Sequence, residues 1–151
     1  VASAARAVDA RVEPRGALAL ARAAAEIGEG FYEAQPPTGY PDRAEAWVSP
    51  GALLARMNFA LALLEGRLPG VRVDAAALVA GADRRRPDEV LEHLLAVLLN
   101  GRAGAGTREV LSAELSAPVI TRLTLDDRGP ADTDVAKLAA LVLGSPEFQR
   151  R

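Results

Sequence analysis

The sequence contains no cysteine, and His93 is its single histidine. Without cysteine the chain cannot form a disulfide and offers no thiol for catalysis. A protein zinc site takes about four ligands from Cys, His and carboxylates, so one histidine effectively excludes it. A Ser-His-Asp triad would need the same histidine, and no serine lies in a G-x-S-x-G turn. No catalytic constellation is therefore recognised, and no metal or cofactor is expected.

The chain also lacks a large excess of charge of either sign, and it lacks long runs of apolar residues. The formal net charge is -2, with basic and acidic residues interspersed, so the chain has no broad positive field for nucleic acid and no basic face for anionic lipid. Every apolar run is broken by Arg, Asn, Glu or Gly before the roughly 18 residues that a spanning helix needs, which argues against membrane insertion. The length of 151 residues predicts one domain, residues 1–151.

The pattern of the chain predicts an all-α fold, a single irregular helical bundle of five to seven helices. Pro14 with Gly28, and Ser49 with Pro50, are start and stop signals of helices, as is Asn100 after an apolar run. Asp132 or Thr133 is expected to cap a late helix. The expected helices span 2–10, 14–27, 49–65, 74–80, 87–100, 107–116 and 132–143, with a final turn from Ser145.

The arrangement of these helices is predicted from their apolar faces. The helix at 87–99 is apolar over more than half of its circumference and must be surrounded, so we expect it near the centre, packed with 49–65. A long, ordered, proline-containing loop is expected at about 28–48. No convincing strand appears, and the β-branched alternation at 119–125 is interpreted as an extended connector.

Three motifs resemble ligand sites but fit simpler structures. The segment "GRAGAG" at 101–106 follows a helix and lacks the Lys-Ser/Thr pair of a phosphate loop, so an interhelical loop is preferred. The aspartates in "DDRGPADTD" at 126–134 miss the spacing of a calcium loop, and a solvated linker explains them. The cluster "RRR" at 84–86 is interpreted as a solvated turn, although an anion at the following helix N-terminus remains an alternative.

Aromatic residues are scarce, yet four of the six fall between Phe31 and Trp47, with Tyr32 and Tyr40 between them. If they are exposed on a loop, these aromatic side chains would stack on a sugar or bind a peptide. When buried, each removes roughly 150–250 Å² from water, a large share of an alanine-rich core. Burial is the preferred interpretation, with Tyr40 and Trp47 filling the core, and a binding surface is the alternative.

Arg56 lies among apolar residues on the helical wheel of 53–65. A buried guanidinium needs a partner, because arginine does not lose its proton. The nearest acceptors in sequence are Asp42, Glu45 and the carbonyls of the preceding loop. The sequence therefore predicts that Arg56 fastens residues 35–48 onto the helix.

Two segments resemble a known family. They are "IGEGFYEAQPPTGYPDRAEAWVSPGALLARMNFALALLEG" at 27–66 and "LGSPEFQRR" at 143–151, similar to the late part of the bacterial domain of unknown function 1800 family. The motif L-L-x-R-x-(N/D)-F places Arg56 and Asn58 in the resemblance, while Glu29-Gly30 departs from the usual Gln-Pro. Members are several times longer, and their early motif rich in His and Arg is absent here. The resemblance implies the C-terminal part of a bacterial, often exported protein, without an established reaction.

Three functions remain open from these observations. The first is a non-catalytic helical domain that completes or supports a larger exported protein, with the missing N-terminal part of that protein as its partner. The second is a domain that contributes a loop or Arg56 to an active-site cleft whose catalytic residues lie in that missing part. The third is an adaptor that binds a peptide or glycan through the aromatic loop at 31–47. Candidate structural or binding positions are Tyr32, Tyr40, Trp47, Arg56 and Asn58.

Overall fold

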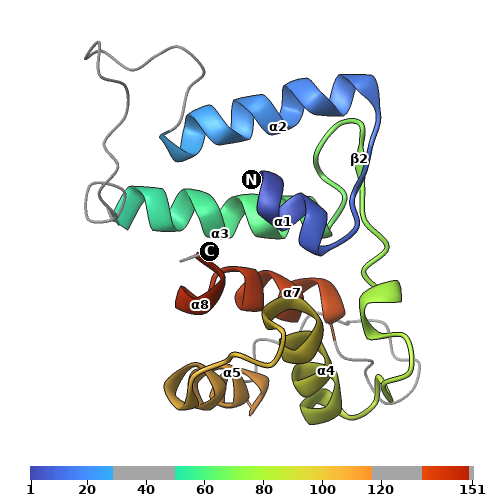
Figure 1. Ribbon diagram of the computed structural model, residues 1–151, viewed down its shortest axis with the longest axis vertical. Helices are drawn as coiled ribbons and strands as arrows, with labels where there is room; N and C mark the ends of the chain where they lie inside the picture. Colours follow the sequence, from blue (N-terminus) through green and yellow to red (C-terminus); the bar gives the residue numbers. More distant parts are fainter. Residues whose placement is uncertain (29–49, 117–133, 150–151) are drawn as a thin grey trace. The chain divides into compact units, whose positions relative to one another are not determined.

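A computed structural model describes residues 1–28, 50–116 and 134–149 (Figure 1). The chain divides into two compact units, Val1–Val73 and Asp74–Arg151, each with its own core. Seven α-helices, one 3₁₀ turn and two very short strands occur in the described ranges. The predicted all-α class is therefore confirmed. The expected loop at 28–48 and the connector at 119–125 lie outside the described residues, apart from Gly28.

The first unit contains α1 (Ala2–Ala7), β1 (Arg11–Val12), α2 (Pro14–Ile27), α3 (Pro50–Leu64) and β2 (Val71–Arg72). Helices α2 and α3 pack side by side, as Figure 1 shows. Local signals explain the ends of α2: Pro14 occupies the first turn, and Gly28 follows the helix with a φ of 113°. The first unit buries the side chains of Ala4, Ala5, Val8, Ala23, Phe59, Ala60, Leu63, Leu64 and Val71.

The two strands correct the expectation that no strand would appear. They pair in antiparallel fashion, with Arg11 opposite Arg72 and Val12 opposite Val71. Each strand has two residues, which is too short to show an alternating pattern in the sequence. Helix α1 also ends three residues earlier than predicted, because Asp9 adopts a φ of 47°.

The β1–β2 ribbon is joined to α2 by a close approach of two glycines. The amide of Glu13 donates to the Gly70 carbonyl at 2.8 Å, and the amide of Gly16 donates to the Glu13 carbonyl at 2.8 Å. A Cβ atom added to Gly16 would lie 2.3 Å from the Gly70 oxygen. Gly70 itself has a φ of 72°, which disfavours other residues. The ribbon therefore depends on the absence of side chains at both positions.

The second unit contains the 3₁₀ turn η2 (Ala77–Val79), α4 (Pro87–Leu99), α5 (Ala105–Ser116), α7 (Val135–Leu143) and α8 (Pro146–Gln149). Helix α4 contacts η2, α5, α7 and α8, so its predicted central position is confirmed within this unit. The expected packing of 49–65 with 87–99 joins residues of the two units and stays a prediction. The second unit buries Leu78, Val79, Val90, Leu91, Leu94, Leu95, Leu98, Leu99, Leu111, Val135, Leu138, Ala139, Ala140, Val142, Leu143 and Phe148.

Helix ends in the second unit follow the sequence signals with three differences, one of which is that α5 begins at Ala105 instead of Thr107. Asn100 ends α4 with a φ of 51°, as predicted. The segment expected to be a helix at 74–80 is instead a 3₁₀ turn, and the Asp74 carboxylate accepts hydrogen bonds from the Ala76 and Ala77 amides. The cap of α7 is Asp134 rather than Asp132 or Thr133, because its carboxylate accepts from the Lys137 amide at 3.1 Å.

Candidate functional site

The first half of α3 carries an exposed row of apolar side chains. Leu53, Leu54 and Met57 retain 42%, 60% and 47% of their accessible surface, whereas Phe59 and Leu63 are buried. Within the described part of the chain, this helix is therefore covered toward its C-terminal end and exposed toward its start. We call Leu53, Leu54 and Met57 the α3 apolar face. Exposed apolar residues that gather in this way mark contact surfaces more often than isolated ones do.

Two of the predicted site positions lie beside this face. Arg56 is half-buried on α3, consistent with the expectation that apolar neighbours restrict its access to water. Asn58 is exposed on the same helix. Tyr32, Tyr40 and Trp47 lie outside the described residues, as do the loop acceptors predicted for Arg56. The contact between Arg56 and residues 35–48 therefore stays a prediction.

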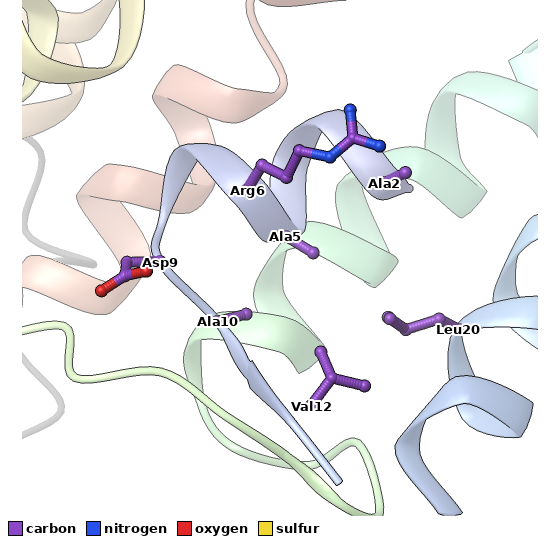
Figure 2. A pocket seen from close by; sticks show the side chains of 7 residues that line it. All are labelled: Ala2, Ala5, Arg6, Asp9, Ala10, Val12 and Leu20. Atoms are coloured by element: carbon purple, nitrogen blue, oxygen red, sulfur yellow. The ribbon is translucent and has the colours of Figure 1, made fainter. Parts of the chain in front are cut away.

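A shallow groove lies within the first unit, where α1, β1 and α2 meet (Figure 2). It has a volume of about 340 Å³ and is lined by Ala2, Ala5, Arg6, Asp9, Ala10, Val12 and Leu20. Figure 2 shows Val12 and Leu20 directed into the groove, Arg6 running along α1 at its rim, and Asp9 turned away. The groove offers aliphatic contacts, the Arg6 cation and, among its lining residues, the Asp9 carboxylate.

The glycine-rich segment at 101–106 leads from α4 into α5. The Gly104 carbonyl accepts the Arg108 amide at 3.1 Å, so Gly104 is the N-cap residue of α5. The Glu147 carboxylate accepts hydrogen bonds from the Gly104 amide at 3.0 Å and from the Thr107 hydroxyl at 2.9 Å. A helix N-terminus attracts an anion, and here a side chain from α8 supplies it. The place that a phosphate would take is therefore occupied by the protein itself.

The remaining charged motifs behave as solvated structure. Arg84, Arg85 and Arg86 are all exposed before α4, in agreement with the predicted turn. Arg86 forms an ion pair with Glu89. His93 is half-buried on α4.

The described residues hold neither a metal-binding cluster nor a membrane-spanning helix. Within 1–28, 50–116 and 134–149, no group of three or more His, Asp or Glu side chains could hold a metal ion. None of the described helices is long and apolar enough to cross a membrane. In the same ranges, no buried polar side-chain atom lacks a hydrogen-bond partner. In this part of the chain, the α3 apolar face and the groove are therefore candidate binding features that involve neither a metal ion nor a buried polar site.

Sequence reasoning missed two features of this part of the molecule. The groove is lined by residues of α1, β1 and α2 together with Asp9 and Ala10, and its three alanines give no signal beyond helix propensity. The carboxylate of Glu147 reaches a helix start that lies more than 40 residues earlier in the chain. Both depend on tertiary contacts that no local pattern encodes.

Comparison with known proteins tests whether the chain belongs to the family that the segments at 27–66 and 143–151 resemble. No curated protein and no solved structure matches the chain. The family described as "Protein of unknown function (DUF1800)" matches residues 1–150. Since this match spans nearly the whole length, the chain belongs to the DUF1800 family, whose function is unknown.

Proposed function

We propose that this chain is a non-catalytic helical part of a larger, exported bacterial protein, which it completes or supports. The partner of its α3 apolar face is then the N-terminal part of the same protein. The observation that supports the proposal is the exposure of Leu53, Leu54 and Met57 on consecutive turns of one helix. Burying such side chains at an interface stabilises it by roughly 25 cal/mol for each Å² removed from water.

A binding experiment between the two parts of the protein tests this proposal. The chain and the N-terminal part are produced separately, and their affinity is measured by calorimetry. Leu54→Lys is expected to weaken binding at least about tenfold, because a charge would enter a dry contact. Leu18→Lys on α2 is the matched control, since Leu18 has a similar exposure of 57%. Equal losses in both variants, or no binding by the unmodified chain, would refute the proposal.

A second candidate function is supported by the position of Arg56. Arg56 is half-buried on α3, and a planar guanidinium can orient a carboxylate or phosphate through two parallel hydrogen bonds. In this alternative the chain contributes Arg56 to a cleft whose catalytic residues lie in the N-terminal part. Arg56→Lys would then reduce turnover in the assembled protein while leaving the affinity between the parts unchanged. The adaptor alternative concerns residues 31–47 and stays a prediction.

A further inference from the structure

The β1–β2 ribbon places two arginines directly opposite each other. Arg11 pairs with Arg72 in the register, and Val12 pairs with Val71. Opposite residues of antiparallel strands point to the same face, and successive residues alternate between faces. Arg11 and Arg72 therefore share one face, while Val71 is buried and Val12 lines the groove on the other.

Like charges directly opposite on a ribbon weaken it. The structure offsets this repulsion with one carboxylate, that of Glu13. Its Oε2 lies 2.9 Å from Arg15 Nε, and its Oε1 lies 3.8 Å from Arg72 Nη2. The side chains of Arg15 and Arg72 remain 70% and 77% exposed. We call Arg11, Arg15 and Arg72 the arginine face; within the described part of the chain, Glu13 is the carboxylate that pairs with Arg15 and Arg72.

The backbone under the arginine face is firmly held. Glu13 and Gly70 are joined by a hydrogen bond of 2.8 Å, and Gly16 lies against Gly70 so closely that neither tolerates a side chain. These contacts hold the backbone from which the arginine side chains extend. Backbone that is ordered before binding loses less entropy when a partner binds.

We propose that the arginine face binds an acidic polypeptide segment. The planar guanidinium accommodates carboxylates through two parallel hydrogen bonds, which a lysine ammonium does not. An extended peptide presents side chains to one face roughly every 7 Å, a spacing that long arginine side chains on neighbouring strands span. The chain as a whole carries a net charge of -2, so it lacks the broad positive field that draws nucleic acid.

The test measures fluorescence anisotropy of labelled peptides at low ionic strength. The probe is an eight-residue peptide of alternating Glu and Gly, and the matched peptide has Gln in place of Glu. The Glu peptide is expected to bind and the Gln peptide not. Arg11→Gln and Arg72→Gln should each weaken binding about tenfold, the loss of one charge-assisted hydrogen bond. Arg22→Gln on α2 removes the same charge from another exposed site and should change binding little.

A second readout separates binding from a structural role. Removing one of two opposed arginines relieves repulsion, so the thermal midpoint of Arg11→Gln should equal or exceed that of the unmodified protein. A clear fall in the midpoint would show that the arginines stabilise the ribbon, and it would overturn the proposal. Equal losses in the Arg22 and Arg11 variants, no binding of the Glu peptide, or tighter binding of a short single-stranded oligonucleotide would overturn it as well.

Discussion

Glu147 and Thr107 join the last helical turn of the described chain to the beginning of α5. The Thr107 hydroxyl lies 2.9 Å from each carboxylate oxygen of Glu147, and the Gly104 amide donates to the same carboxylate at 3.0 Å. In a capping box the amide of the N-cap residue donates to a side chain three residues later, whereas here the distant Glu147 carboxylate accepts the Gly104 amide. A Cβ at Gly104 would lie 2.9 Å from Glu147 Oε1, so the glycine leaves room for the distant carboxylate.

Replacing Glu147 should destabilise the second unit. Glu147→Ala leaves the Gly104 amide and the Thr107 hydroxyl without this acceptor, at an expected cost of about 1–3 kcal/mol in the free energy of unfolding. Glu147→Gln keeps one acceptor oxygen and should cost less. Urea denaturation measures both, with Glu114→Ala on the exposed side of α5 as the control. If the Glu147 and Glu114 variants are equally stable, the cap contributes nothing.

Gly16→Ala should disrupt the junction between α2 and the ribbon. The new methyl group would lie 2.3 Å from the Gly70 carbonyl oxygen, so the backbone must shift, at about 1–3 kcal/mol or more. Gly51→Ala is a matched control, because a Cβ at Gly51 meets nothing within 4 Å and alanine favours a helix. Thermal unfolding should show a lower midpoint for the first variant and an equal or higher one for the second. The reverse order would contradict the close approach.

Trp47 is predicted to be mostly buried against the helix that starts at Pro50. Trp47→Ala should then cost about 3–5 kcal/mol, the usual range for emptying a large aromatic site. Because Trp47 is the single tryptophan, its fluorescence reports this environment directly, and a blue-shifted emission is expected. Emission typical of tryptophan in water, together with unchanged stability of the mutant, would favour the exposed binding loop instead.

Arg56 is predicted to fasten residues 35–48 to α3. Arg56→Met keeps much of the side-chain length and removes the charge, so the loop should be cleaved faster by a protease while the helices stay formed. Limited proteolysis with mapping of the cut sites measures the first effect, and circular dichroism measures the second. Arg22→Met on α2 serves as the control for loss of an exposed arginine. Equal cleavage rates in both variants would mean that the loop is ordered by other contacts.

The sequence by itself determined the helical class and the ends of the helices with strong local signals. Pro14 with Gly28 delimits α2, and Pro87 with Asn100 delimits α4, because proline suits a first turn and the left-handed conformation ends a helix. The central position of α4 within the second unit also followed from its composition, since a helix that is apolar over more than half of its circumference requires neighbours around most of it. Signals of this kind act within a few residues and are visible in the local sequence.

Only the tertiary structure decided which distant residues meet. Arg11 faces Arg72 across about 60 residues of sequence, and strands of two residues carry no periodic pattern that predicts this pairing. The half-buried position of Arg56 followed from its neighbours on the helical wheel, whereas the exposure of Leu53 and Met57 did not. Burial of an apolar face depends on which element covers it. The same leucine pattern fits a helix that is covered by other parts of its own chain and a helix that is covered by a separate binding partner.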